Sequence, residues 1–210
     1  MSDSASFWDR HAARYAKRQI RNQAAYEETL AHARRYLSPT DRAIELGCGT
    51  GTTALLLADS VSHLTGIDLS GKMIEIARDK AAADGVANVE FAISDARADQ
   101  FEESAFDVVL AFNLIHLLSD AEEAARDVRR LLKPGGVFVS KTPCLAQETV
   151  FLRPLVWVLR RIGIAPPVAF LSFETLEQAI SSAGLDIIET ALYPATSSSR
   201  FIVARRPEDH

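Results

Sequence analysis

The segment Ala43–Ala58 reads AIELGCGTGTTALLLA and places three glycines between a short apolar run and a leucine-rich one. The first run predicts a buried strand, and the second predicts a helix. Glycine tolerates positive φ and lets a ligand approach the backbone closely, so glycines at this junction predict a ligand-binding turn. We therefore interpret the segment as the first strand, loop and helix of an α/β sheet.

Apolar runs and helix-forming segments continue to alternate after this loop. Such alternation favours right-handed crossovers and a doubly wound, mostly parallel α/β sheet with strands buried on both faces. The sequence KPGG at 133–136 predicts a helix stop and a turn into the next strand. The expected strands are Ala43–Leu46, Leu64–Asp68, Val89–Ile93, Asp107–Phe112 and Val137–Lys141, and the expected helices are Thr52–Ser60, Gly71–Ala83 and Ala121–Leu132.

The two ends of the chain follow a different pattern. Residues 5–37 read as helical. After the sheet, a helix over Phe173–Ser182 precedes two further strand candidates, Asp186–Leu192 and Arg200–Arg205. Because a parallel pair needs a long crossover, the short turn PATSSS between these strands predicts an antiparallel hairpin.

The composition is that of an ordinary globular domain. The chain has 210 residues, of which 48% are hydrophobic and 24% charged, and this favours one domain. Its net charge of −5 disfavours a nucleic-acid partner, which needs clustered Lys and Arg. Cys48 and Cys144 form no disulfide framework or zinc spacing, and the amino-terminal sequence lacks the apolar core of a signal peptide. We therefore expect a cytoplasmic protein without a bound metal.

Three acidic residues, Glu45, Asp68 and Asp95, stand at or near the ends of the first three expected strands. Open α/β sheets bind ligands at the carboxyl ends of their strands. A carboxylate at Asp68 can accept hydrogen bonds from both hydroxyls of a ribose, and one at Asp95 can accept an adenine amino group. Glu45 suits a cationic ligand better than a diphosphate, because like charges repel.

A dinucleotide is the other cofactor that such a loop commonly binds. Its fingerprint is G-x-G-x-x-G, whereas this loop reads G-C-G-T-G and has Thr52 where the third glycine would stand. A hydride-transfer constellation is also missing from the sequence. A nicotinamide oxidoreductase is therefore kept only as the second enzyme class.

The motifs ELGCGTG, GIDLSGKMIEIAR, SDA, FDVVLAFNLIHLL and LLKPGGVFVSKT, in this order and spacing, resemble the class I S-adenosylmethionine-dependent methyltransferases. The resemblance covers roughly residues 40–142. It implies a seven-stranded sheet with an antiparallel last strand, and S-adenosylmethionine as the cofactor. The implied cofactor-binding residues are Tyr15, Glu45, Gly47, Cys48, Gly49, Gly51, Asp68, Leu69, Met73, Asp95, Ala96 and Asn113.

Within this set the resemblance implies separate roles. Leu69 and Met73 would flank the adenine, Asp95 and Ala96 would lie at its edge, and Asn113 would lie near the methionine part. Tyr15 would cover the cofactor. Cys48 is more typical of a small packing residue than of a nucleophile, because no partner base accompanies it.

Methyl transfer needs a general base only when the accepting atom holds a proton near neutral pH. His116, in NLIHLL, is the candidate catalytic base because histidine titrates in this range. The alternative is that His116 begins a helix or lines the pocket. Trp8, Tyr15 and Tyr26 offer aromatic faces for a sulfonium or an alkylated ammonium, and packing in the core is their alternative role.

The methyl acceptor is less well defined. NLIH differs from the Asn/Asp-Pro-Pro-Tyr pattern used on planar amino groups, which disfavours nucleobases, and a catechol-type magnesium site lacks its carboxylates. The apolar segment 150–171 also contains Arg153, Arg160 and Arg161. It could line a pocket for a hydrophobic small molecule, lie on an anionic membrane as in a lipid or quinone methyltransferase, or pack on the sheet with solvated arginines. A protein that binds the cofactor without catalysis also stays open.

These expectations divide the chain into four parts of one methyltransferase domain. A helical lid spans 1–40, and the cofactor-binding core spans 41–143. A substrate-side insertion follows at 144–171, and the last helix and the hairpin occupy 172–210.

Overall fold

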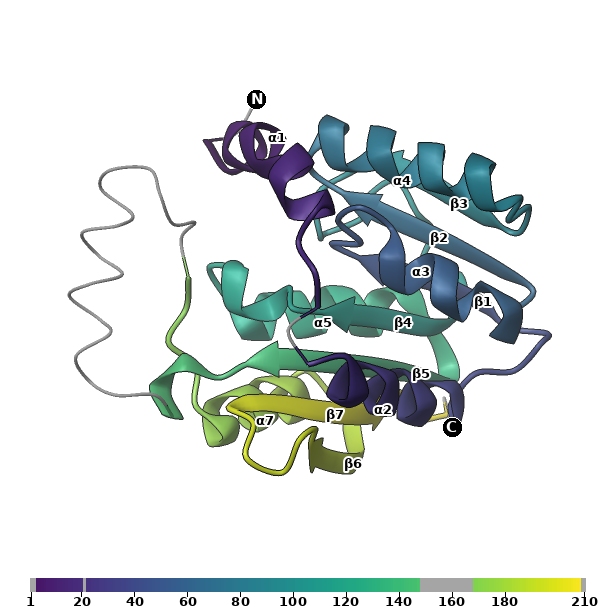
Figure 1. Cartoon of the computed structure of the whole chain (residues 1–210). Helices are drawn as coiled ribbons and strands as arrows, with labels where there is room; N and C mark the ends of the chain where they lie inside the picture. Colours follow the sequence, from purple (N-terminus) through teal and green to yellow (C-terminus); the bar gives the residue numbers. More distant parts are fainter. Residues whose placement is uncertain (1–2, 21, 148–167, 209–210) are drawn as a thin grey trace.

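A seven-stranded sheet forms the centre of the computed structural model, which describes residues 3–20, 22–147 and 168–208. The strand order is β3-β2-β1-β4-β5-β7-β6 (Figure 1). β7 runs antiparallel to both of its neighbours, and the other neighbouring pairs are parallel. The strands are β1 (Arg42–Leu46), β2 (His63–Asp68), β3 (Val89–Ile93), β4 (Phe106–Phe112), β5 (Leu132–Pro143), β6 (Asp186–Leu192) and β7 (Ser199–Arg205). The predicted fold class, with its final hairpin, is confirmed.

The helices begin and end at residues whose side chains suit those positions. Ser70 accepts a hydrogen bond from the Met73 N–H and caps α4, which ends at the left-handed Gly85. Asp120 caps α5 in the same way, through the N–H groups of Glu122 and Glu123. The helices are α1 (Asp3–Ala16), α2 (Gln23–Arg34), α3 (Thr52–Leu57), α4 (Gly71–Asp84), α5 (Ala121–Leu131) and α7 (Phe173–Ser182), with short 3₁₀ helices η1 (Ala58–Ser60), η2 (Ile115–Leu117) and η3 (Leu145–Gln147).

Helices cover both faces of the sheet, as a doubly wound fold requires. Successive residues of a strand point to opposite faces, so Ala43 packs with α2, α3 and α4, whereas Ile44 packs with α5 and α7. Both side chains are fully buried. This explains why the central strands are apolar at nearly every position, which is the pattern that revealed them.

The helical reading of residues 5–37 is wrong for one stretch, because α1 and α2 are separate helices and residues 17–20 and 22 between them are not helical. Asn22 begins α2 by accepting a hydrogen bond from the Ala25 N–H at 3.0 Å. α1 packs against α4, whereas α2 places Leu30 and Ala33 in the core on the sheet (Figure 1). One straight helix cannot meet both surfaces, so tertiary packing overrides the local pattern.

The sequence KPGG also differs from its prediction. The helix ends at Leu131, one residue early, and Leu132 already pairs with Phe106 as part of β5. The register then shifts before Val108 pairs with Val137, so residues 133–136 bulge out of the strand. Gly135 has φ +76°, and its N–H donates to the Arg206 carbonyl at 2.9 Å. KPGG therefore forms a bulge inside β5 and not a turn before it.

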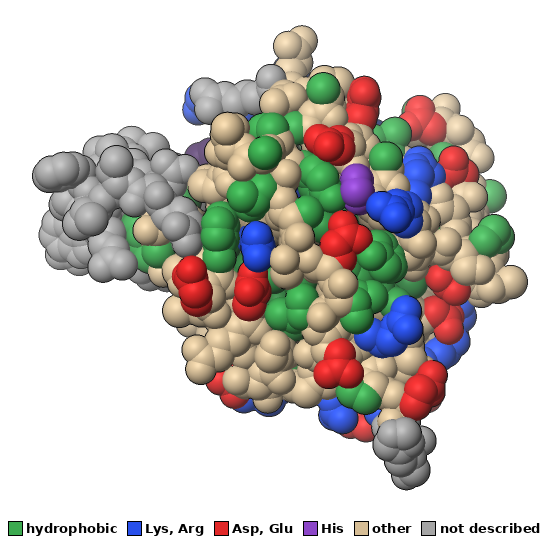
Figure 2. Space-filling model, turned by 90° about the horizontal axis from the view of Figure 1, so that it is seen from below, with side chains coloured by type: hydrophobic (Ala, Val, Ile, Leu, Met, Phe, Trp, Pro, Cys, Tyr) green, Lys and Arg blue, Asp and Glu red, His purple; other side chains and the backbone are tan. Residues whose placement is uncertain are grey.

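The surface carries charges of both signs. Figure 2 shows acidic and basic side chains interspersed over the described part of the face seen from below. Among the residues that the structure describes, none of the helices has the length and apolarity needed to cross a membrane. The predicted membrane-surface or pocket-lining segment 150–171 lies outside the described residues except for its last part, from Val168 onward.

Candidate functional site

A cavity of about 610 Å³ opens at the carboxyl ends of β1, β2 and β4, beneath α1. It brings together residues that are far apart in the sequence. Among the predicted cofactor-binding residues, those that line it are Tyr15, Gly47, Gly49, Asp68, Leu69, Met73, Asp95, Ala96 and Asn113. Glu45, Cys48, Gly51 and His116 are not among its lining residues. The structure thus separates the predicted set into residues at the cavity and residues behind its wall.

The glycine loop follows β1 and forms the floor of the cavity. Gly47, Gly49 and Gly51 all have positive φ, at +63°, +54° and +74°. A Cβ on Gly47 would lie 2.6 Å from Leu114 Cδ1, and one on Gly49 would lie 3.7 Å from Tyr15 Cε1. Both positions therefore need glycine for their backbone conformation, and Gly47 needs it also because Leu114 approaches closely.

Gly51 and Cys48 face the protein interior. A Cβ on Gly51 would lie 2.7 Å from Phe91 Cζ and 2.8 Å from Ala77 Cβ. Glycine at this position therefore lets α4 and β3 pack closely against the loop. Cys48 is buried, and burial raises the pKa of its thiol well above the usual value. These properties fit packing positions behind the loop, and cofactor contact at either residue stays a prediction.

Asp68 links the glycine loop to the start of α4. Its Oδ2 accepts the Gly49 N–H at 3.0 Å, and its Oδ1 accepts the Ser70 N–H at 2.9 Å. Because each carboxylate oxygen has two acceptor positions, both oxygens retain capacity for hydroxyl groups in the cavity. Asp68 is thus suited to bind a diol while it also holds the glycine loop next to the start of α4.

Lys80 of α4 supports the glycine loop from behind, a contact that the sequence did not reveal. Its Nζ donates hydrogen bonds to the Thr50 carbonyl, Thr50 Oγ1 and Thr52 Oγ1, each at 3.0 Å. An ammonium group has three donors, so all of them are used. Burial lowers the pKa of Lys80. The contacts fix the loop between Gly49 and Gly51 in one conformation.

Helix α1 forms the roof of the cavity. Ser4, Trp8 and Tyr15 line the cavity from this helix. Asp9 Oδ1 accepts hydrogen bonds from Ser70 Oγ at 2.6 Å and from the Lys72 N–H at 3.1 Å, and these bonds lower the pKa of Asp9. Its carboxylate thus lies at the amino terminus of α4, where the helix dipole favours negative charge. α1 is therefore held at the position predicted for a lid, and lid motion stays a prediction.

Apolar side chains form the remaining wall, and most of them were missed from the sequence. These residues are Phe112, Leu114, Leu117, Leu118, Val168 and Ala169. The Ala169 N–H donates to the His116 carbonyl at 2.7 Å and ties the segment that precedes α7 to η2. The apolar spacing of NLIHLL was the available signal for the leucines, and Val168 and Ala169 belong to the segment 150–171, for which pocket lining was one of the three alternatives.

Glu45 lies beneath the glycine loop and is only 2% exposed. Burial raises its pKa to about 8, although a hydrogen bond from the Ala54 N–H lowers it and the nearby Asp68 raises it. Its Oε2 has no hydrogen-bond partner among the described residues. A buried acidic oxygen without a donor favours a nearby cationic or donor group from a ligand.

Glu45 predicts a pH-dependent stability. Its folded pKa of about 8 exceeds the ordinary value of 4.5, so the folded chain keeps a proton that the unfolded chain releases between these values. The free energy of unfolding should therefore have its full contribution from Glu45 below about pH 4.5. As the pH rises to about 8, the free energy of unfolding should fall by several kcal/mol. Urea unfolding at about pH 5 and about pH 8.5 measures this loss.

The Glu45→Gln variant should lose most of that pH dependence, because the amide stays neutral throughout. Glu103→Gln is the matched control, since Glu103 is exposed and should leave the slope unchanged. A slope that survives in Glu45→Gln would assign the loss of stability to other groups.

His116 lies in η2, behind the apolar wall. Its Nδ1 is buried and has no partner among the described residues, and burial lowers its pKa to about 4. The ring is therefore neutral at pH 7 and a weak proton acceptor. Its role as a general base stays a prediction, and kcat of the His116→Gln variant is the measurement that tests it.

Comparison with known proteins finds a match over the segment that contains the glycine loop. A family profile described as a methyltransferase domain matches residues 43–136, which contain the loop, Asp68 and Asp95. The profile match, the methyltransferase relatives and the fold together support a class I S-adenosylmethionine-dependent methyltransferase.

Two curated relatives of this chain illustrate the likeness. The uncharacterized methyltransferase YcgJ of Bacillus subtilis is 35% identical over 98 residues, which are 47% of this chain and 39% of the relative. The 27-O-demethylrifamycin SV methyltransferase of Amycolatopsis mediterranei is 31% identical over 148 residues, 70% of this chain and 54% of the relative. The chain spans about half or less of the length of these relatives.

Solved structures agree with the fold. The complex between the Trm112 methyltransferase activator and the putative methyltransferase of Haloferax volcanii contains a chain that matches with a TM-score of 0.81 and 19% identity. The match covers 99% of this chain and 99% of the matching chain in the complex. This match shows that the two chains share the same fold.

Proposed function

We propose that this chain transfers a methyl group from S-adenosylmethionine to a small apolar acceptor by in-line displacement. The observation that carries the proposal is one cavity that joins Asp68 and the glycine loop to an apolar wall. The first group of residues suits an adenosyl ligand, and the second suits a hydrophobic acceptor. The rifamycin methyltransferase among the relatives is in keeping with an acceptor of this kind.

The residues present fit the cofactor. Asp68 would hold the ribose hydroxyls, with Leu69 and Met73 against the adenine and Asp95 with Ala96 at its edge. A Cβ at Gly47 would crowd Leu114, so glycine keeps the floor of the cavity open. Glu45 lies behind the cavity wall, and its unpartnered oxygen would accept a hydrogen bond from a donor group, because the carboxyl keeps its proton at pH 7. When bound, S-adenosylmethionine supplies a methyl group already activated by its sulfonium.

The chain's own contribution is alignment and exclusion of water. Asp68 and the glycine loop hold one end of the reacting pair, and the apolar wall orients the other. Such positioning converts a bimolecular reaction into one that behaves as unimolecular, which supplies a large part of the rate enhancement. Trp8 and Tyr15 of α1 cover the cavity and reduce its contact with water.

Calorimetric titration followed by a transfer assay tests the proposal. The chain should bind S-adenosylmethionine and S-adenosylhomocysteine and should bind NAD weakly or not at all. With a radiolabelled methyl donor, label should enter the organic phase of extracts that contain hydrophobic small molecules. Binding of the donor without transfer would favour a non-catalytic cofactor-binding protein. Tight NAD binding with no response to the methyl donor would overturn the proposal in favour of an oxidoreductase.

A further inference from the structure

The loop from Ser94 to Phe101 follows β3 and brings Ser94, Asp95 and Ala96 to the cavity. It contains no helix or strand. Ala98 has φ +54°, a left-handed conformation that is unfavourable for alanine. The hydrogen bonds within the loop are short-range turns, such as Phe101 N–H to the Ala98 carbonyl at 3.0 Å, together with Ser94 Oγ to Gln100 Oε1 at 2.8 Å. These bonds shape the loop itself, and contacts from outside the loop attach it to the rest of the protein.

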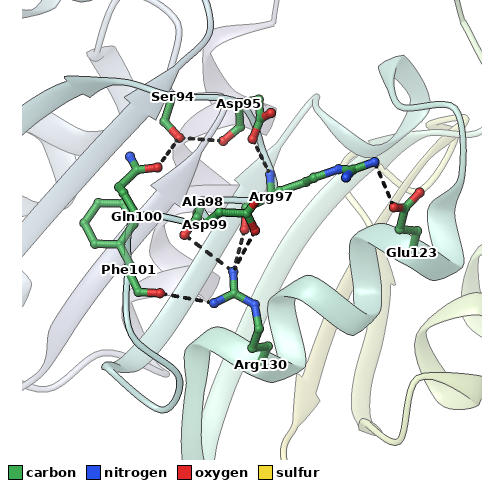
Figure 3. A network of polar contacts seen from close by, with 9 residues as sticks. All are labelled: Ser94, Asp95, Arg97, Ala98, Asp99, Gln100, Phe101, Glu123 and Arg130. Carbon is green, nitrogen blue, oxygen red and sulfur yellow. Dashed lines mark hydrogen bonds and ion pairs between the residues drawn. The ribbon is translucent and has the colours of Figure 1, made fainter.

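Arg130 of α5 supplies such contacts. Figure 3 shows its guanidinium facing the inner side of the loop, where it donates to backbone carbonyls. The acceptors are the Arg97 carbonyl at 2.6 Å, the Phe101 carbonyl at 3.1 Å and the Ala98 carbonyl at 3.4 Å. The Asp99 carboxylate is 3.9 Å from the same group. A planar guanidinium can meet several carbonyls at once, whereas an ammonium group presents a point charge.

Two further contacts join α5 to the same region. Arg97 forms an ion pair with Glu123 of α5 at 3.0 Å (Figure 3). The Ser104 N–H donates to the Arg130 carbonyl at 2.8 Å, just past the loop. Asp95 itself is turned back toward the loop, since its Oδ1 accepts the Arg97 N–H at 3.1 Å. The position of the Asp95 carboxylate thus depends on a residue whose carbonyl Arg130 holds.

We propose that Arg130 is a positioning residue, which fixes the loop of Asp95 so that the cavity distinguishes adenine from hypoxanthine. Arg130 is not among the lining residues and acts only through the loop. The inference rests on the proposed function, in which Asp95 lies at the adenine edge. A carboxylate accepts the adenine amino group but repels the carbonyl oxygen that hypoxanthine has at that place. Correct placement of Asp95 therefore favours one base over the other.

The test compares two ligands, S-adenosylhomocysteine and S-inosylhomocysteine, by calorimetry. The unmodified chain should bind the adenosyl compound at least about tenfold more tightly, as expected for one well-placed hydrogen bond. Arg130→Met should weaken adenosyl binding by about tenfold and inosyl binding by less than about threefold, so that discrimination between the bases is largely lost. Thermal unfolding of each variant checks that it is folded.

Matched variants separate positioning from general damage. Arg126→Met changes an exposed arginine of the same helix that pairs with Glu122, and it should keep the discrimination. Lys80→Met loosens the glycine loop and should weaken both ligands alike. Should Arg130→Met not fold, Arg130→Lys supplies the comparison, since it keeps the charge but not the planar fork. It should show an intermediate loss of discrimination.

Each outcome bears on a different statement. Equal weakening of both ligands in the Arg130 variants, or no change at all, would overturn the positioning role. Failure of the unmodified chain to bind the adenosyl compound would overturn the proposed function itself, and with it the premise of this inference.

Discussion

Replacing Asp68 with alanine should weaken binding of S-adenosylhomocysteine by about 100-fold. The variant removes the expected bonds to two ribose hydroxyls, and hydrogen bonds to a charged group contribute about 1.5–3 kcal/mol each. It also deprives the Gly49 and Ser70 N–H groups of their acceptor, so the glycine loop loses one of its links to α4 and keeps the link through Lys80. Calorimetric titration measures the affinity directly and needs no knowledge of the methyl acceptor.

Two further variants sharpen this prediction. Asp68→Asn keeps one acceptor oxygen and should weaken binding by roughly tenfold. Asp79→Ala is the matched control, because Asp79 is an exposed residue of α4 away from the cavity and should bind as the unmodified chain does. Affinity of Asp68→Ala within about threefold of the original would exclude Asp68 as the ribose ligand.

Replacing Gly51 with alanine should lower the free energy of unfolding by about 2–5 kcal/mol. Part of this loss, about 1–2 kcal/mol, comes from forcing a side chain into the left-handed region. The rest, about 1–3 kcal/mol, comes from overpacking. The new Cβ would lie within 3 Å of Phe91 and Ala77, both of which are buried. Urea unfolding at constant pH measures the change.

Gly85→Ala is the control that isolates the packing part. Gly85 has φ +66°, close to the +74° of Gly51, but a Cβ added there meets nothing within 4 Å. It should therefore show only the backbone cost and the small gain from restricting the unfolded chain. Equal losses in the two variants would mean that α4 moves aside at no cost and that the tight contact has no energetic weight.

The central strands were predictable because they are buried on both faces, and the partly exposed edge strand β3 because it is β-branched or apolar at most positions. Val89–Ile93 was expected and observed with the same limits, and Arg42–Leu46 differs by a single residue. The positions of Asp68 and Asp95 near one cavity follow from the parallel sheet, which brings the carboxyl ends of its strands to one edge. Short-range pattern and sheet topology together were sufficient for these features.

Contacts between distant side chains were not predictable. Lys80 reaches Thr50, Asp9 reaches Ser70 and Arg130 reaches Arg97, and none of these pairs has a local sequence signal. Each depends on how a helix packs beside a loop. The break between α1 and α2 has the same origin, because the two helices satisfy different surfaces. The residues expected to contact the cofactor can therefore be found from local sequence patterns. The residues that hold them in place depend on long-range packing.

The position of α1 has a practical consequence for handling the protein. Ser4, one residue after the start of the helix, already lines the cavity, so an affinity tag fused ahead of it would stand over the entrance. The other end of the chain is attached elsewhere, since Arg206 bonds to Gly135 and Gly136 at the bulge of β5, and the two termini lie far apart (Figure 1). Purification handles and surface-immobilisation linkers therefore belong at the carboxyl terminus.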